Sequence, residues 1–197
     1  MIQHDELTHI FREPPILDTP RLVLRKMLKK DSADMFEYAC RKDVTRYLLW
    51  EPHENETYTY KYLSYLQSRY RAGDFYDWAV IWRESGKMIG SCGFTRFNAD
   101  ANSGELGYVL NPDYWGLGIA PEAVRAVMRF GFTELHLHRL EARYMIGNDR
   151  SRRVMEKVGM TFEGVARDSM YVKGNYVSIG TCAILQPEYR QRWGGVE

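Results

Sequence analysis

The chain has almost no excess of charge of one sign. Its 197 residues include 27 Lys and Arg against 26 Asp and Glu, which gives a formal net charge of +1 at pH 7. Nucleic-acid-binding domains usually carry a basic excess, so this balance argues against a protein that binds DNA or RNA. The balance also gives no acidic bias that would select a polycationic partner, although it leaves room for a local charged pocket.

Paired cysteines and long apolar runs are also missing. Cys40, Cys92 and Cys182 form no C-x-x-C motif, so we expect reduced thiols in a cytoplasmic protein rather than a redox or zinc motif. His136 and His138 lack a third ligand at a recognisable spacing, so no metal site is expected. The first residues contain no signal-peptide core, and no run of about 18 apolar residues is present to span a membrane.

The hydrophobic pattern predicts one mixed domain. We expect a polar N-terminal arm over residues 1–15, a single domain over 16–190 and a C-terminal tail over 191–197. The domain is predicted to be α/β (α+β), with a mixed, mostly antiparallel central sheet. About four helices are expected over residues 31–40, 57–71, 121–134 and 149–158, and about seven strands over residues 21–25, 77–83, 88–97, 105–110, 139–146, 161–172 and 176–185.

The turn between the strand ending at Leu110 and the helix near Pro121 carries the clearest chemical signal. Gly116 and Gly118 remove side chains that would block the approach of a ligand to the backbone. Pro121 suits the first turn of a helix, whose exposed N–H groups favour an anion such as a pyrophosphate. An ordinary strand-to-helix turn has the same pattern. A Walker loop is excluded, because no G-K-[ST] sequence follows.

This turn is one of several motifs that together resemble the GNAT N-acetyltransferases. The motifs are Gly107-Tyr108-Val109-Leu110, Trp115-Gly116-Leu117-Gly118-Ile119-Ala120 with Glu122-Ala123, His138-Arg139-Leu140-Glu141-Ala142, the segment from Asn148 to Met160, and Phe162-Glu163-Gly164. Their order over about residues 17–187 is similar to the RimJ/RimL branch, the ribosomal-protein N-terminal acetyltransferases. The resemblance implies the GNAT fold and direct transfer of acetyl from acetyl-CoA to a primary amine.

The resemblance also implies which residues bind acetyl-CoA. The glycine-containing loop would hold the pyrophosphate, a strand edge would pair with the pantetheine amides, and a residue after the next strand would hydrogen-bond the pantetheine arm. A backbone N–H of Val109 or Leu110 would hold the thioester carbonyl. Asn148 is equally a candidate turn or cap residue. The loop residues are Trp115, Gly116, Leu117, Gly118, Ile119 and Ala120, the strand-edge residues are Tyr108, Val109 and Leu110, and the residue after the next strand is Asn148.

Two residues are candidates for proton transfer. Glu105 shares a strand face with Gly107, and the resemblance places a catalytic glutamate on this strand in several GNAT enzymes. Glu105 is therefore the candidate base that takes the proton from the amine, and a surface carboxylate is the alternative. Ser151, which the resemblance places near the coenzyme A sulfur, is the candidate acid, with helix capping as its alternative. RimL-type enzymes carry a glutamate base before the glycine of the last hairpin. Met170 occupies the aligned position, so that base is absent.

The basicity of the acceptor favours a protein N-terminal α-amine. An α-amine has a pKa of about 7.7–8.0 and a lysine side chain about 10.4, so making lysine neutral near pH 7.4 costs about 4 kcal/mol, against under 1 kcal/mol for the α-amine. Polyamines, aminoglycosides and amino-acid-like antibiotics stay open as acceptors, and so does a non-catalytic CoA-binding sensor with this fold. The pattern also leaves a homodimer open.

Overall fold

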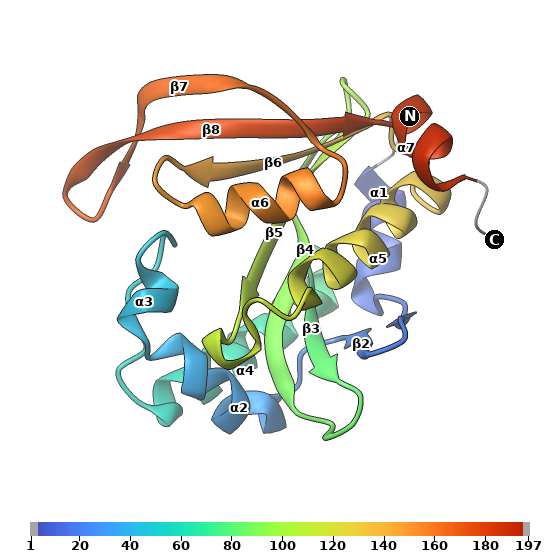
Figure 1. Cartoon of the computed structure of the whole chain (residues 1–197). Helices are drawn as coiled ribbons and strands as arrows, with labels where there is room; N and C mark the ends of the chain where they lie inside the picture. The colour runs from blue at the N-terminus through green and yellow to red at the C-terminus, as the bar shows by residue number, and fades with distance from the viewer. Residues whose placement is uncertain (1–3, 195–197) are drawn as a thin grey trace.

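A mixed sheet of eight strands lies at the centre of the part of the chain that this computed structural model describes, residues 4–194 (Figure 1). The spatial order is β1-β2-β3-β4-β5-β6-β8-β7, and all neighbours are antiparallel except β5 and β6. This arrangement confirms the predicted fold class and adds a short first strand. The strands are β1 (Leu17–Asp18), β2 (Leu22–Arg25), β3 (Tyr76–Trp82), β4 (Met88–Asn98), β5 (Ser103–Leu110), β6 (Arg139–Met145), β7 (Thr161–Val172) and β8 (Asn175–Leu185).

Seven α-helices accompany the sheet in the described residues, against about four expected. Four of them, α2, α4, α5 and α6, lie within two residues of the predicted bounds, because their periodicity and caps are local features. The others are the short helix α3 and the two terminal helices. In chain order they are α1 (His4–Arg12), α2 (Ser32–Ala39), α3 (Lys42–Thr45), α4 (Glu56–Ala72), α5 (Ile119–Thr133), α6 (Asp149–Lys157) and α7 (Gln186–Trp193).

Helix α1 replaces most of the predicted polar arm. Leu7 and Phe11 are buried, and the ring of Phe11 packs edge-on against Tyr76 and Trp78. Leu7 and Phe11 stand four positions apart, so one helical face is apolar although charged residues surround it in the sequence. The arm prediction was wrong for residues 4–12. Residues 1–3 of that arm and residues 195–197 of the predicted tail lie outside the described residues.

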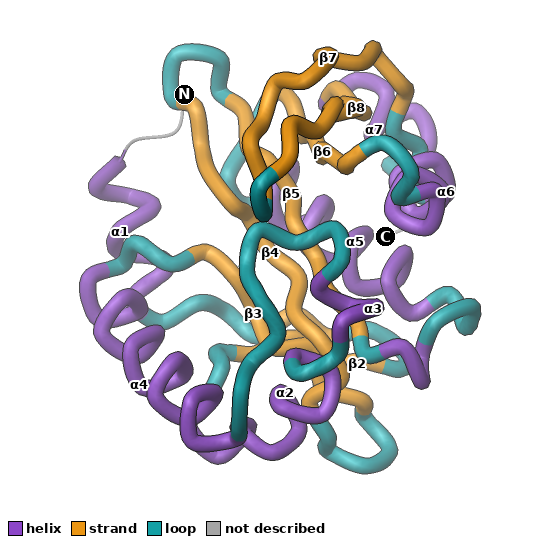
Figure 2. The backbone as a smooth tube through the Cα atoms, turned by 90° about the vertical axis from the view of Figure 1, so that its left-hand side faces the viewer, coloured by secondary structure: helices purple, strands orange, loops and turns teal. Residues whose placement is uncertain are grey.

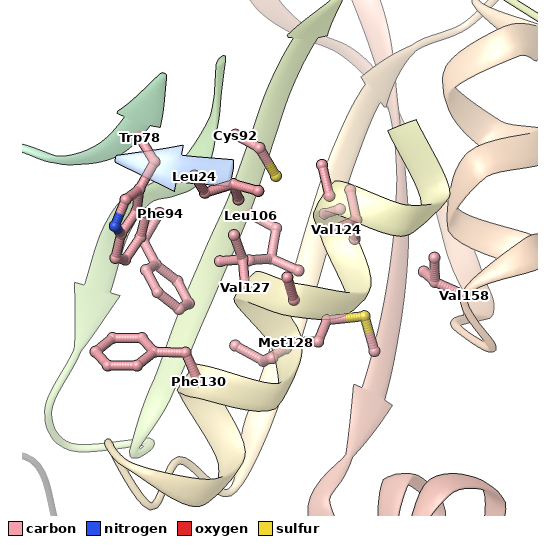
Figure 3. Packing of buried hydrophobic residues seen from close by; sticks show 14 of the residues in the cluster. Leu24, Trp78, Cys92, Phe94, Leu106, Val124, Val127, Met128, Phe130 and Val158 are labelled. Atoms are coloured by element: carbon pink, nitrogen blue, oxygen red, sulfur yellow. The ribbon is translucent and has the colours of Figure 1, made fainter. Parts of the chain in front are cut away.

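Buried clusters lie on both faces of the sheet. On one face, α5 packs Val124, Val127 and Phe130 against a cluster that includes Phe94 and Leu106 of the sheet (Figure 3). On the other face, α2 and α4 share a second cluster with β3 and β4. No helix in residues 4–194 is both long enough and apolar enough to cross a membrane.

The strands β5 and β6 separate part-way along, and this separation creates an opening. They pair only from Ser103 with Arg139 to Leu106 with Ala142. Beyond that point β6 continues against β8, whereas residues 107–110 of β5 keep only β4 as a neighbour. The second half of β5 therefore has one free edge. Figure 2 shows β6, β7, β8 and α6 above this region and α2, α3 and α4 below it.

Candidate active site

Two cavities meet at the free edge of β5. The first, here called the sheet cavity, has a volume of 630 Å³ and lies over the face of β3, β4 and β5 that α2 and α4 cover. The second, here called the loop cavity, has a volume of 580 Å³ and lies between the start of α5 and α6. A ligand that extends along β5 would reach both. The residues that line both cavities are Tyr47, Leu48, Tyr108, Val109, Asn148 and Ser151.

The backbone pairing decides which groups of β5 face this free edge. Asn111 N donates to a carbonyl of β4 at 2.7 Å. Because residues in an antiparallel pair alternate in direction, Val109 also points its N–H toward β4. Tyr108 and Leu110 then direct their N–H and C=O groups away from β4. The Leu110 carbonyl accepts the indole N–H of Trp115 at 2.9 Å, which leaves the Tyr108 amide groups and the Leu110 N–H at the edge.

The loop cavity is bounded by the turn into α5. Gly116 and Gly118 have φ angles of +81° and +75°, a left-handed conformation that suits glycine. Gly118 is the N-cap of α5 and offers no side chain to the first helical N–H groups, so these donors are left for another partner. Of the loop residues singled out in the sequence, Trp115, Gly116, Gly118, Ile119 and Ala120 line the cavity, and Leu117 does not.

A polar clamp from the connection between β1 and β2 holds this turn. Arg21 forms an ion pair with Glu122 in the first turn of α5 (Nη2–Oε2, 2.7 Å) and donates to the Leu117 carbonyl at 3.0 Å. Thr19 Oγ1 donates to Glu122 Oε1 at 2.6 Å. Burial alone would raise the pKa of Glu122, but the hydrogen bonds from Thr19 and Arg21 bring it below its usual value. The clamp fixes the direction in which the free N–H groups point.

Three cationic side chains line the loop cavity. Arg150 lies over the ring of Trp115 at 4.3 Å, and Arg153 and Lys157 follow it on α6. Arg152, the other basic residue of this helix, forms an ion pair with Glu156 at 2.9 Å and does not line the cavity. The cavity thus combines helical N–H donors with positive charge, which suits a phosphorylated ligand.

Hydroxyl groups gather where the two cavities join. Tyr108 Oη donates to the Ser151 carbonyl at 2.9 Å and lies 2.9 Å from Ser151 Oγ. With its only proton used in the first bond, Tyr108 accepts from the Ser151 hydroxyl in the second. Burial raises the pKa of Tyr108, so the phenol stays protonated. Asn148 is the N-cap of α6, where its Oδ1 accepts the Ser151 N–H at 3.2 Å, and its side chain also faces the junction.

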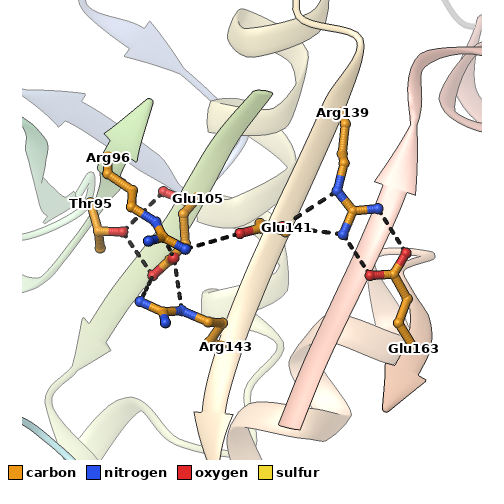
Figure 4. Close-up of polar contacts among 7 residues, drawn as sticks. All are labelled: Thr95, Arg96, Glu105, Arg139, Glu141, Arg143 and Glu163. Atoms are coloured by element: carbon orange, nitrogen blue, oxygen red, sulfur yellow. Dashed lines mark hydrogen bonds and ion pairs between the residues drawn. The ribbon is translucent and has the colours of Figure 1, made fainter. Parts of the chain in front are cut away.

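Glu105 lines the sheet cavity, but its carboxylate is already engaged (Figure 4). Oε2 lies 2.8 Å from Arg96 Nε and 2.8 Å from Arg143 Nε, and Oε1 accepts from Thr95 Oγ1 at 3.0 Å. The residue is buried, so the alternative of a surface carboxylate is wrong. Oε2 accepts no hydrogen bond from residues 4–194, so the two guanidinium groups hold the carboxylate by charge, and these ion pairs favour a structural role for Glu105.

Aromatic rings line the outer part of the sheet cavity. The ring of His53 lies 5.2 Å from Trp50, 4.9 Å from Tyr58 and 5.6 Å from Tyr62. His53 Nδ1 is 2.8 Å from Thr59 Oγ1. Burial lowers the pKa of His53, so the imidazole is neutral near pH 7. The cavity therefore presents ring faces and no charged histidine to a ligand.

Asp77 is the residue that sequence reasoning missed. It lies on β3 and lines the sheet cavity together with Met170, the residue in place of the RimL-type glutamate. Its Oδ1 accepts the backbone N–H of Trp78 at 3.1 Å. Burial raises the pKa of Asp77 to about 7. The only signal in the sequence is a carboxylate inside the otherwise apolar and aromatic strand from Tyr76 to Trp82.

Comparisons with known proteins agree with this geometry. The family model described as the acetyltransferase (GNAT) domain matches residues 21–161. The N-acetyltransferase p20 of Bacillus licheniformis is 30% identical over 173 residues, which are 88% of this chain and 97% of p20. The [ribosomal protein uS5]-alanine N-acetyltransferase of Escherichia coli is 25% identical over 181 residues, which are 88% of this chain and 92% of that protein.

A solved structure shows the same likeness. The GNAT-family acetyltransferase from Bacillus anthracis superposes with a TM-score of 0.79 at 28% identity, over 88% of this chain and 99% of that one. The family match covers well over half of the chain, and the p20 match extends over almost all of both proteins. The chain is therefore an N-acetyltransferase of the GNAT family, with a ribosomal-protein N-acetyltransferase among its relatives.

Proposed function

We propose that this enzyme transfers the acetyl group of acetyl-CoA directly to a protein N-terminal α-amine. The observation that carries the proposal is the meeting of two cavities at the free edge of β5, because a donor and an acceptor can each occupy one cavity and react where they join. The distinct linings of the two cavities support this division of roles.

The loop cavity fits coenzyme A. The N–H groups at the start of α5, around Gly116 and Gly118, would hold the pyrophosphate, and Arg150, Arg153 and Lys157 would neutralise phosphate charge. Most of the anion site is backbone, so the near-zero net charge of the chain is compatible with phosphate binding. Bound acetyl-CoA supplies an activated acyl group as a thioester.

The free edge of β5 would orient that thioester. Tyr108 offers backbone groups to the pantetheine amides, and the Leu110 N–H would polarise the thioester carbonyl. Of the two donors expected from the sequence, Val109 is turned toward β4, so the geometry favours Leu110. The hydroxyl pair of Ser151 and Tyr108 at the junction would protonate the leaving sulfur.

The sheet cavity fits an amine. Both arginines that line it are held in ion pairs, Arg69 with Asp74 at 2.7 Å and Arg143 with Glu105 at 2.8 Å. The carboxylates and ring faces that remain attract an ammonium group. The E. coli relative bears the name of a ribosomal-protein alanine N-acetyltransferase, which supports an α-amine over a lysine side chain. Transfer is direct, because Cys92 and Cys182 are fully buried and cannot take up an acetyl group.

The test is a thiol-release assay with purified protein, acetyl-CoA and a panel of amines. Peptides that start with Ala, Ser or Met are compared with the same peptides carrying a blocked N-terminus and one internal lysine, and with polyamines and aminoglycosides. We expect the free α-amine peptides to give at least a tenfold higher kcat/KM than the blocked peptides, with the product acetylated at the N-terminus by mass spectrometry. A preference for polyamines or aminoglycosides would refute the α-amine acceptor, and no thiol release with any amine would refute catalysis.

A further inference from the structure

Formation of the amide releases one proton from the acceptor nitrogen, and the sheet cavity must contain a group to take it. Glu105 has both carboxylate oxygens in contact with Arg96, Arg143 or Thr95. Met170 is apolar. Asp77 is a third candidate, and it lies on the floor of the same cavity.

The register of the sheet places a row of glycines between Asp77 and the free edge of β5. Asp77 pairs with Gly93 of β4, and Gly93 pairs with Gly107 of β5. Neither glycine places a side chain beside the carboxylate, and the methyl group of Thr95 lies over Gly107 at the far end of the row. A Cβ on Gly93 would lie only 2.8 Å from Asp77 Oδ1. The carboxylate therefore lies over Gly93, on the face of the sheet that lines the sheet cavity.

The surroundings of Asp77 differ from those of Glu105. Hydrogen bonds come from the Ser91 side chain and the Trp78 N–H. No salt bridge of Asp77 occurs among residues 4–194. The tyrosines that face it are neutral near pH 7, because burial raises the pKa of Tyr38 on α2 and of Tyr62 and Tyr70 on α4. Burial also raises the pKa of Cys92, which lies on the opposite face of the sheet.

Charged groups lie at the margins of this pocket. The negative charges of Asp31 and Asp34 raise the pKa of Tyr38. The positive charge of Arg25 lowers the pKa of Tyr70, and that of Arg69 lowers the pKa of Tyr62. Arg25 is paired with Asp31 at 2.8 Å and Arg69 with Asp74 at 2.7 Å. Desolvation is consequently the main influence on Asp77, and it brings the pKa of the carboxyl to about 7, where it can both take and release a proton.

We propose that Asp77 is the catalytic base of this enzyme, which accepts the proton of the acceptor amine directly or through one water molecule. This assignment rests on the proposed acetyl transfer. The nitrogen forms a bond to the thioester carbon and gives one proton to the Asp77 carboxylate. The C–S bond breaks with its electron pair on sulfur, and the hydroxyl pair of Ser151 and Tyr108 gives the sulfur a proton to form the free thiol of coenzyme A. Asp77 then releases its proton to water, and the hydroxyl pair regains one from water.

The test compares the wild type with Asp77→Asn and with Asp100→Asn, the same chemical change in the exposed β4–β5 turn. The thiol-release assay with the preferred amine is run from pH 5.5 to 9.5, and the Kd for acetyl-CoA is measured by calorimetry. We expect kcat of Asp77→Asn to fall about 100-fold at pH 7, with the deficit shrinking at high pH, and the Kd to stay within about twofold of the wild type. Asp100→Asn should match the wild type.

A second variant covers a folding failure of Asp77→Asn. Ser91→Ala removes a hydrogen bond that lowers the pKa of Asp77, so the ascending limb of the wild-type kcat profile should move to higher pH while the plateau persists. The assignment would be overturned if Asp77→Asn kept the wild-type kcat and pH profile. It would also be overturned if the ascending limb of the kcat profile stayed at the same pH in Ser91→Ala. Neither result would contradict acetyl transfer itself. A wild type that acetylates no amine would instead overturn the proposed function and this assignment with it.

Discussion

Replacing Asp77 by Asn should make the protein more stable at neutral pH, and the gain should depend on pH. The pKa of Asp77 is about 7 in the folded protein, against an ordinary value of 3.8. Between these two values the folded state binds more protons than the unfolded state, so the free energy of unfolding falls as the pH rises and then levels off above about pH 7. Asn has no such ionisation, because it keeps one neutral form throughout.

The size of the effect follows from the shift. A change of about three pH units corresponds to about 4 kcal/mol when each unit is worth about 1.36 kcal/mol. Asp77 keeps part of its surface open to the cavity, and water there reduces the penalty, so we expect about half of that value. A difference of about 2 kcal/mol corresponds to a rise in Tm of about 4–8 °C for a chain of this size.

The measurement is urea unfolding of the wild type and of Asp77→Asn at pH 5 and pH 8, with Asp100→Asn as the control. The stability difference between Asp77→Asn and the wild type should be about 1.4 kcal/mol larger at pH 8 than at pH 5, because about two of the three pH units of the shift lie above pH 5. The control should show the same small difference at both pH values. A difference that does not change with pH would show that Asp77 titrates normally, and the desolvation argument would then be wrong.

Three further substitutions test other parts of the structure. Gly118→Val should weaken acetyl-CoA binding by at least tenfold in calorimetry, whereas Gly86→Val, at a similar φ of +71° in a remote turn, should keep the affinity; equal losses would refute the loop assignment. Glu105→Gln should lower the free energy of unfolding by about 1 kcal/mol, because two partly exposed guanidinium groups lose their counterion, and a stability equal to the wild type would contradict the network. Phe11→Ala should cost about 3–5 kcal/mol in urea unfolding if α1 belongs to the core; a loss under about 1 kcal/mol would show that α1 is a detachable arm.

Helix α1 has a helical periodicity that its charged residues hide. Leu7 and Phe11 carry a helical spacing, but charged neighbours in this short segment obscured it. Their burial depends on Trp78, which lies more than sixty residues further along the chain. Helix α5, by contrast, has apolar residues over several turns, and its predicted start was only two residues late.

The candidate site shows the same difference between features set by local sequence and features set by distant residues. The loop at Gly116 and Gly118 could be recognised from the sequence because its chemistry depends on backbone conformation and on the helix that follows directly. The roles of Glu105 and Asp77 could not, because each depends on which distant groups surround the carboxylate. Arg143 reaches Glu105 across the parallel pair of β5 and β6, and the glycine row beside Asp77 exists only in the register of β3, β4 and β5.

The sequence by itself determined the order of the seven long strands and of α2, α4, α5 and α6, the fold class and the position of the loop, since periodicity, caps and glycine act over a few residues. The tertiary structure decided which carboxylate is paired with guanidinium groups and which lies desolvated in the cavity that reaches the open edge of β5. Burial and ion pairing are properties of neighbours in space, and chain order does not record them. The near-neutral net charge of the whole chain thus conceals two different charge environments, at Glu105 and at Asp77.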